Sequence, residues 1–500
     1  MTTDYGAVCE RVDSLNSWVL TELADLNRDI LARRRPPGDL GAELARSVLA
    51  DLPPPELLPV REAQQLVVLL GLAGASLSRH YQELDRGHLA APELAFAPYR
   101  VGHEAVPFLV YFGQLAERTG TGHCHRDSYA ALTRWNVPDT EVWWAGERVA
   151  VLAGVFSDGQ VRTYTGTADE RRFFELIKVS EAIELAINTA LMPMSDAMLD
   201  LRDPQAADRV RLATVLLGEL RVLNAGFAAL PPERGLRADY FMDVFRQYAV
   251  HWTLADIPPS GALDPQAIAR DCLLGIKTPA YEAHTRRIFP ALLGAERELL
   301  ARLMQRPSLP DMALRSLGLD AVTLAGMAPG ELRRTVSRYP VLAALCLLLT
   351  EHARMSGVHL KITKQYLFAP QRRREAAGLG DRPVVPNHLG TTGMDERYLE
   401  ELTRARHRHP LGCLRVLGAE LECLAGLDRV RARSADPGTL VRFTGPGGGQ
   451  ARTPEWLLPV PQEPARGRKE RIGAGTTVAG ADTGMGAGND GGIYSEKTYS

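Results

Sequence analysis

Apolar residues recur at helical spacing along most of this chain. The pattern is clearest in seven segments, which are 9–34, 62–84, 170–200, 204–228, 280–305, 340–368 and 395–425. Proline and glycine clusters separate them, as in ARRRPPGDL at 32–40 and DIPPSGALDP at 256–265. Such long periodic segments with these breaks predict an all-α protein.

Two stretches depart from the helical pattern. ERVAVLAGVFSDGQVRTYTG, at 147–166, alternates apolar and polar residues around the turn signal SDG, which predicts one small hairpin. From about residue 435 the chain becomes rich in glycine and proline, with too few apolar side chains to form a core. We therefore expect a disordered tail over 435–500.

Composition and charge narrow the classes of partner. The chain has 500 residues, enough for a large core, and 58 Lys and Arg balance 60 Asp and Glu. No basic face for nucleic acid is implied. The N-terminus lacks the charged-then-apolar order of a secretory signal, and the longest strongly apolar run, Val341–Leu349, is too short to span a bilayer. We expect a cytoplasmic protein with reduced cysteines, without nucleic-acid or membrane partners.

One histidine lies inside an apolar helical pattern. In SGVHLKITKQYL, at 356–367, the spacing places His359 on the same helix face as Met355 and Ile362, with His352 two turns earlier. The ordinary interpretation is a core histidine that is hydrogen-bonded to a carbonyl or water. The alternative is a haem ligand, since a neutral imidazole on a rigid helix commonly holds haem iron. The residues alone leave both open.

Longer motifs carry a resemblance to a known family. HLKITKQYL, at 359–367, and the glycine loop LGTTGMD, at 389–395, resemble the C-terminal region of the indoleamine 2,3-dioxygenase superfamily. YFMDVFRQYAVHW at 240–252, CLLGI at 272–276 and RRIFP at 286–290 resemble further family text in the same order.

A second branch of the superfamily resembles the middle of the chain. WNVP at 135–138 and RTYTG at 162–166 look like the monodechloroaminopyrrolnitrin synthase branch, which belongs to pyrrolnitrin biosynthesis. The resemblance covers roughly residues 130–425.

The resemblance implies a fold and a cofactor. It implies a helical haem-binding domain over 131–434, with a smaller helical domain over 1–130 that covers the distal side. Haem b would be held by His359 as the proximal iron ligand, with Met355, Ile362 and Phe241 in the haem pocket. No acid or base is assigned.

The substrate residues are also implied by the resemblance. Arg246 would hold the carboxylate of an amino acid with its planar fork of donors, although a surface salt bridge is the ordinary role of such an arginine. Thr391, with Gly390 and Thr392, would close over the substrate ammonium. Three further residues are expected to line the pocket: Ser260 and Gly261 from PPSGAL, which replaces the family's GSAGQSS-type loop, and Tyr164 on the distal wall.

The expected function is a haem-dependent oxygenase that uses O2 on tryptophan or a modified aromatic amino acid in specialised metabolism. Ring dioxygenation, mono-oxygenation and rearrangement all remain open. The altered PPSGAL loop also permits tyrosine or a non-aromatic amino acid as substrate. A non-catalytic haem-binding protein is the third alternative. The sequence does not indicate an oligomeric state.

Overall fold

The structure is a computed structural model that describes residues 5–121, 126–197, 199–379, 384–385, 390, 392–428, 440–444 and 453–457. The chain divides into two units, Met1–Leu458 and Pro459–Ser500. The second unit lies outside the described residues, so the fold below is that of the first.

Helices make up most of the described chain, which confirms the prediction of an all-α protein. The α-helices are α1 (Tyr5–Trp18), α2 (Ala24–Leu31), α3 (Gly38–Ser47), α4 (Val60–Leu84), α5 (Phe108–Thr119), α6 (Ala168–Asp196), α7 (Pro204–Ala229), α8 (Ala238–Tyr240), α9 (Pro265–Leu274), α10 (Pro279–Ile288), α11 (Gly294–Gln305), α12 (Leu309–Ser316), α13 (Ala321–Ala325), α14 (Pro329–Arg338), α15 (Pro340–Thr363), α16 (Ala369–Ala376), α17 (Glu396–His407) and α18 (Ala419–Ala425).

Short helical turns and strands complete the fold. The turns are η1 (Val19–Leu23), η2 (Leu49–Asp51), η3 (Pro55–Leu57), η4 (Arg86–Ala90), η5 (Pro92–Phe96), η6 (Ala130–Trp135), η7 (Phe241–Phe245), η8 (Arg246–Tyr248), η9 (Gly261–Leu263), η10 (Phe289–Ala291), η11 (Lys364–Phe368), η12 (Gly412–Leu417) and η15 (Glu455–Leu457). The strands are β1 (Arg100–Val101), β2 (Val106–Pro107), β3 (Thr140–Trp144), β4 (Glu147–Leu152) and β5 (Val441–Phe443).

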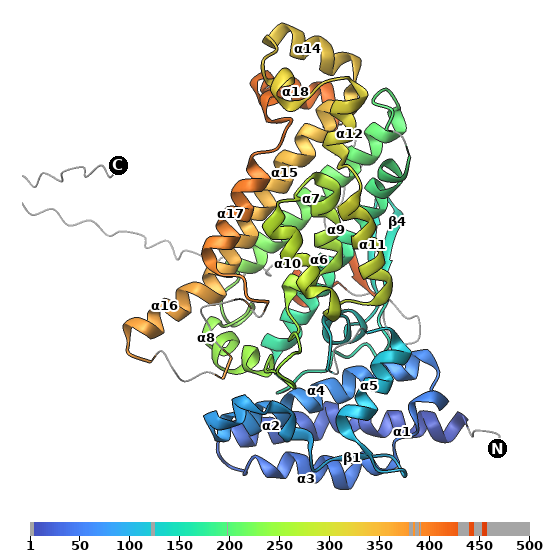
Figure 1. Cartoon of the computed structure of the whole chain (residues 1–500), viewed down its shortest axis with the longest axis vertical. Coiled ribbons are helices and arrows are strands. Elements are labelled where there is room, and N and C mark those ends of the chain that lie inside the picture. Colours follow the sequence, from blue (N-terminus) through green and yellow to red (C-terminus); the bar gives the residue numbers. More distant parts are fainter. Residues whose placement is uncertain are drawn as a thin grey trace, which may run out of the picture. The chain divides into compact units, whose positions relative to one another are not determined.

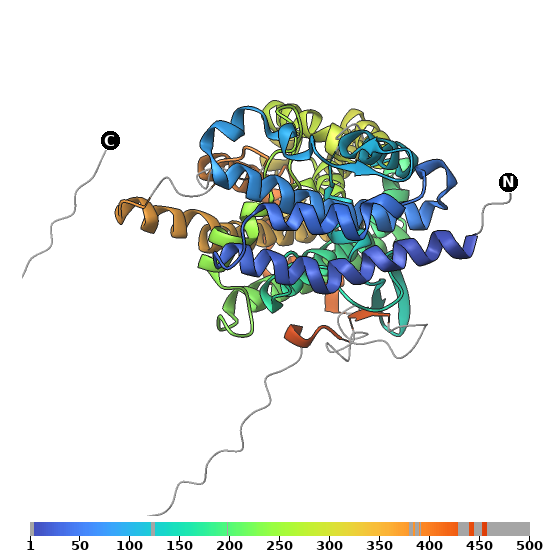
Figure 2. The same cartoon turned by 90° about the horizontal axis from the view of Figure 1, so that it is seen from below.

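The long helices α6, α7 and α15 pack together, and the helices of the N-terminal part form a layer at one end of them (Figure 1). Figure 2 shows this layer from below, with α1 and α4 in contact. Helix α4 joins the layer to the rest of the fold because it also packs against η6 and η8. By length and composition alone α7 and α15 could cross a membrane, but core helices share these properties, and much of α15 is buried here.

The ends of several predicted helices differ from the structure. The segment 280–305 forms α10 and α11 with a break at Phe289–Ala291, where Pro290 lacks the N–H that a continuous helix needs. The segment 395–425 likewise forms two helices, separated by η12 and by Gly418, which has a φ of 55°. The segment 340–368 is helical as expected, and the helix continues into α16.

A small hairpin exists, but the predicted one over 147–166 with its turn at SDG is wrong, because the observed hairpin lies over 140–152. Strand β4 pairs with β3, and the turn is Ala145–Gly146, where both residues have positive φ values of 50° and 84°. The stretch after the SDG signal adds no strand. Two consecutive left-handed residues match the twist of a tight hairpin, so this turn determines the register.

Part of the predicted tail belongs to the fold. Strand β5 pairs antiparallel with β3, which makes a sheet of order β4-β3-β5. Trp456 is buried, with its ring 5.3 Å from that of Phe227 and its Nε1 donating to Glu175 Oε2 at 3.2 Å. The prediction of a disordered tail from 435 is therefore wrong for these segments, while 458–500 lies outside the described residues.

A buried lysine joins α6 to the hairpin and to η6. Lys178 is fully buried, and its Nζ donates to the carbonyl oxygens of Ala153 at 2.8 Å, Val137 at 3.3 Å and Arg134. Burial lowers the pKa of Lys178 to about 7. The three carbonyls satisfy the donors of an ammonium that would otherwise be too costly to bury.

Glycines on α4 allow close packing against the loop after η8. A Cβ on Gly74 would lie 2.5 Å from Cη2 of Trp252. Trp252 is fully buried, and its ring centroid is 5.0 Å from those of Phe96 and Phe112. The missing side chain at Gly74 therefore lets the indole ring lie directly on the helix.

Candidate functional site

His359 faces an internal cavity, called here the His359 cavity. Its empty volume is about 1040 Å³, part of it open to solvent. It is bounded mainly by α6, α9, α10, α15 and α17, and its polar and titratable lining residues are Ser180, Glu184, Asn224, Asp264, Arg270, Asp271, Tyr281, His284, Thr285, Ser356, His359 and Arg406. Met355 also lines it.

The surroundings of His359 suit a metal ligand. Its side chain is accessible from the cavity, yet the enclosing protein desolvates it and lowers its pKa to about 4, with Arg406 and Arg270 adding to the shift. The imidazole is therefore neutral at neutral pH. Among the described residues none hydrogen-bonds a ring nitrogen of His359, whereas its backbone carbonyl accepts from Thr363 at 3.0 Å. A neutral imidazole with an accessible nitrogen can bind a metal ion.

His352 differs from His359 in its exposure, in its ring partner and in its position relative to the cavity. It is fully buried, its Nε2 lies 2.9 Å from Asp271 Oδ1, and it does not line the cavity. Burial lowers the pKa of His352 to about 4 as well. The structure thus gives His352 the role of an ordinary core histidine.

Two buried ion pairs form part of the cavity wall. Arg406 donates to both oxygens of Asp271, at 2.6 and 3.1 Å, and Arg270 pairs with Glu184. Burial alone would raise the pKa of Asp271, but Arg406 and the hydrogen bond to His352 hold it well below its usual range. Because these charges compensate one another, the wall can be buried without isolated charge.

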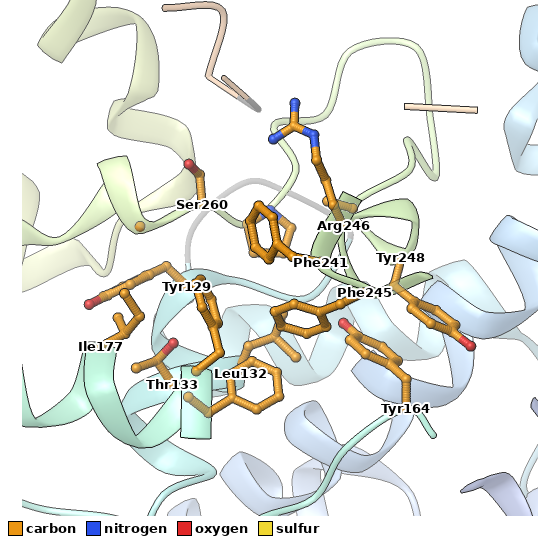
Figure 3. Close-up of a pocket in the computed structure, with 15 residues that line it drawn as sticks. Tyr129, Leu132, Thr133, Tyr164, Ile177, Phe241, Phe245, Arg246, Tyr248 and Ser260 are labelled. Atoms are coloured by element: carbon orange, nitrogen blue, oxygen red, sulfur yellow. The ribbon is translucent and has the colours of Figure 1, made fainter. Parts of the chain in front are cut away.

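A second cavity, the aromatic cavity, lies beside the first. Its empty volume is about 670 Å³, part of it open to solvent, and Figure 3 shows the rings of Tyr129, Tyr164, Phe241, Phe245 and Tyr248 around it. Its lining residues are Tyr129, Leu132, Thr133, Tyr164, Phe173, Phe174, Ile177, Phe241, Phe245, Arg246, Tyr248, Ala249, Pro259, Ser260 and Gly261. Such an apolar wall with few polar groups is typical of a site for an aromatic ligand.

Stacking holds one wall of the aromatic cavity in place. The rings of Tyr164 and Tyr248 are parallel, with centroids 4.0 Å apart. The guanidinium of Arg79, from α4, lies 4.3 Å from the ring centroid of Tyr248. Cation–π and ring stacking thus brace this wall of the aromatic cavity from the N-terminal layer.

Arg246 connects the aromatic cavity to a third cavity. Its side chain lines both, and in Figure 3 its guanidinium extends away from the rings of Tyr164 and Phe245. Burial lowers the pKa of Arg246 to about 10, so the group stays cationic at neutral pH. An acidic group of a ligand whose ring fills the aromatic cavity can reach this guanidinium.

The third cavity, called here the outer cavity, is larger and more polar. Its empty volume is about 1300 Å³. It is lined by Gln82, Leu89, Arg246, Ala249, Val250, His251, Leu254, Asp256, Ile257, Pro258, Arg287, Ile288, Val384, Val385, Gly390, Thr392 and Gly393. The glycine loop therefore borders the same space as Arg246.

A histidine–aspartate pair lines the outer cavity. Nδ1 of His251 lies 2.7 Å from Asp256 Oδ1, while Asp256 Oδ2 accepts from the backbone N–H groups of Trp252 at 2.6 Å and Thr253 at 3.1 Å. Arg126, also buried, lies 3.4 Å from the same oxygen. Although burial opposes it, the charge of Arg126 and the hydrogen bond with His251 lower the pKa of Asp256.

The three cavities share lining residues and are therefore adjacent. Ile177 and Gly261 border both the His359 and the aromatic cavities. Arg246 and Ala249 border the aromatic and outer cavities, and Ile288 borders the outer and His359 cavities. His359 and Arg246 thus line neighbouring cavities.

Most residues proposed from the sequence meet in this region. His359 and Met355 line the first cavity, Gly261 lines the first and second, and Tyr164, Phe241, Ser260 and Arg246 line the second. Gly390 and Thr392 line the outer cavity. Ile362 is only partly buried and lines none of the three. Thr391 lies outside the described residues.

Sequence reasoning missed much of the lining. The aromatic pair Phe173–Phe174, Phe245 and Tyr248 were not proposed, nor were His251 and Arg287 in the outer cavity. The adjacent phenylalanines were a usable signal, because two neighbouring bulky rings at the start of a helix need two different partners. His251 and Arg287 lie in the quoted motifs YFMDVFRQYAVHW and RRIFP, but the motifs attached no role to them.

The comparisons with known proteins assign neither a family nor a function to this chain. No protein-family model matches this chain, and a search of curated proteins finds no match. Within the described residues, no group of three or more His, Cys, Asp or Glu side chains could hold a metal ion. Function must therefore be argued from the cavities themselves.

Proposed function

We propose that this protein is a haem-dependent oxygenase that acts with O2 on an aromatic amino acid, of the tryptophan type, with a fold like that of the indoleamine 2,3-dioxygenase superfamily. The observation that carries the proposal is the pairing of His359, a neutral histidine accessible from a cavity, with an adjacent aromatic cavity bordered by Arg246.

The residues present fit haem b. A single accessible imidazole on a long helix is the donor set of a five-coordinate haem, whereas a zinc or iron site made only of side chains needs several ligands. His359 would hold the iron, and Met355 would pack beside it. Haem, when bound, supplies the activation of O2 that side chains do not provide.

The chain's own residues would bind and orient the substrate. The aromatic ring would lie among Phe173, Phe241 and Phe245, which exclude water, and Arg246 would hold the carboxylate. Gly390 and Thr392 border the space beside Arg246, where backbone groups and a hydroxyl could meet the ammonium. Fixing both ends of the amino acid places one ring edge toward Gly261 and the His359 cavity.

An absorption spectrum tests the proposal directly. The protein is expressed with a haem precursor, and the ferrous form is recorded before and after L-tryptophan and other amino acids are added. We expect a histidine-ligated haem whose spectrum shifts with tryptophan. A spectral shift with another amino acid alone would change the proposed identity of the substrate. Bound haem whose spectrum shifts with none of the amino acids would favour a non-catalytic haem-binding protein.

Two histidine variants make a matched pair. His359→Ala should abolish haem retention, because the accessible imidazole is removed. His352→Ala should keep haem, because that ring is occupied by Asp271 in the core. Haem content per folded protein is the measurement, with thermal unfolding as a check on folding. Retention in His359→Ala would refute the assignment.

A further inference from the structure

The outer cavity is larger than a free aromatic amino acid requires. With the ring in the aromatic cavity and the carboxylate at Arg246, such a ligand ends at the border between the two spaces. Beyond it lies the outer cavity, with an empty volume of about 1300 Å³ against about 670 Å³ for the aromatic one, each partly open to solvent. A longer ligand could occupy both.

The charges of the outer cavity favour an anion. Arg246 from η8 and Arg287 from α10 both line it. The one acidic lining residue among those described is Asp256, which hydrogen-bonds His251 and lies 3.4 Å from Arg126, itself paired with Asp127 at 2.7 Å. Two arginines against one carboxylate among the described lining residues leave an excess of positive charge in this cavity, which attracts a ligand with negative charge.

Arg287 is held in position but retains donors. Its Nη2 donates to the carbonyl of Thr392 and lies 3.0 Å from His284 Nδ1. A guanidinium has five N–H groups, and the described residues accept only from Nη2 of this one. The glycine loop thereby fixes a guanidinium that can still bind a carboxylate.

We propose that the outer cavity is a second substrate subsite in which Arg287 binds a carboxylate additional to the one held by Arg246. The substrate class is then an aromatic amino acid joined to an acidic unit, such as an acidic dipeptide. This inference rests on the proposed function, because it assumes an aromatic amino acid in the aromatic cavity. A haem propionate has the same carboxylate chemistry, so the test must separate the two sources.

Binding measurements on the full-length protein, with and without haem, test the subsite. The probes are L-tryptophan, the dipeptides Trp-Glu and Glu-Trp, and their glutamine counterparts Trp-Gln and Gln-Trp. A charge-assisted contact predicts that at least one acidic dipeptide binds about tenfold or more tightly than its glutamine counterpart. Arg287→Gln should reduce that ratio to about one, and any loss of L-tryptophan affinity through the Thr392 contact should be shared equally by the acidic and glutamine dipeptides.

The neighbouring arginine provides the control. Arg286 lies on the same helix, pairs with Glu282 at 3.2 Å and lines none of the cavities, so Arg286→Gln should change no affinity. Arg246→Gln should lower the affinity for all five ligands.

Several outcomes would overturn the subsite. Equal affinities for the acidic and glutamine dipeptides would overturn it. An Arg287→Gln variant that loses haem but keeps the affinity ratio would also overturn it, because Arg287 would then bind a haem propionate and not the dipeptide carboxylate. If L-tryptophan binds in an Arg246-dependent way and the dipeptide ratio is one, only this inference fails. If none of the five ligands binds, the proposed function fails with it.

Discussion

Gly74 and Gly226 provide the sharpest test of the packing, because the same substitution should have opposite effects at the two sites. Both lie in long helices, α4 and α7, where alanine is intrinsically better than glycine. A Cβ on Gly226 would meet nothing within 4 Å. Gly226→Ala should therefore stabilise the protein by about 0.5–1 kcal/mol.

At Gly74 the new methyl group would collide with the Trp252 ring. It would lie 2.5 Å from Cη2 and 2.6 Å from Cζ2, and the ring is fully buried against Phe96 and Phe112. Overpacking of this kind costs about 1–3 kcal/mol. After subtracting the helix gain of about 1 kcal/mol, Gly74→Ala should destabilise by about 0–2 kcal/mol.

The two variants should thus differ by about 0.5–3 kcal/mol, with Gly226→Ala the more stable. Urea unfolding followed by far-ultraviolet circular dichroism measures the difference, with equal denaturant slopes as the condition for comparing midpoints. If Gly74→Ala were as stable as Gly226→Ala, the indole would be free to move, and the argument that Gly74 is needed for close packing would be refuted.

Three further predictions concern stability. The pKa of Lys178 falls from 10.5 to about 7 on folding, so the unfolded chain binds more protons than the folded chain between these pH values. The free energy of unfolding should therefore fall as the pH drops from 10.5 to 7, by on the order of 5 kcal/mol. Lys178→Met should flatten this part of the pH profile, and an unchanged slope in the variant would contradict the prediction. Trp456→Ala should lower the free energy of unfolding by about 3–5 kcal/mol, measured by urea unfolding, because a buried ring on Phe227 is lost. Truncation after residue 439 should lower the melting temperature below that of truncation after residue 458, because β5 and Trp456 are removed; equal melting temperatures would show that neither segment stabilises the fold.

The helices were predictable because their apolar period is local information. Segments such as 204–228 and 340–368 match α7 and the α15–η11 helix within a residue or two at most ends. The errors occur where a distant contact decides the structure. Strand β3 was missed because its edge is completed by β5, and Val441–Phe443 was missed because glycine-rich text surrounds it.

The candidate site was predictable only in part, for the same reason. His359 and Arg246 lie in motifs long enough to recognise, and the structure places both at cavities. By contrast, Arg287 and His251 line the outer cavity only because α10 and the loop after η8 meet in space. His251 lies in YFMDVFRQYAVHW, the same motif as Arg246, and Arg287 lies in RRIFP, but neither motif encodes which cavity these two side chains reach. Ile362 shows the reverse error, since a shared helix face did not bring it to the cavity wall.

The pairing of β3 with β5 has a consequence for how the chain is made. Thr140 pairs with Phe443, about 300 residues later in the sequence. At a synthesis rate of about 5–20 residues per second, β3 waits some 15–60 seconds on the ribosome before its partner emerges. During that time one edge of the hairpin offers unpaired N–H and C=O groups to any other nascent strand. Correct folding of this protein in the cell thus depends on keeping that edge protected until β5 has been synthesised.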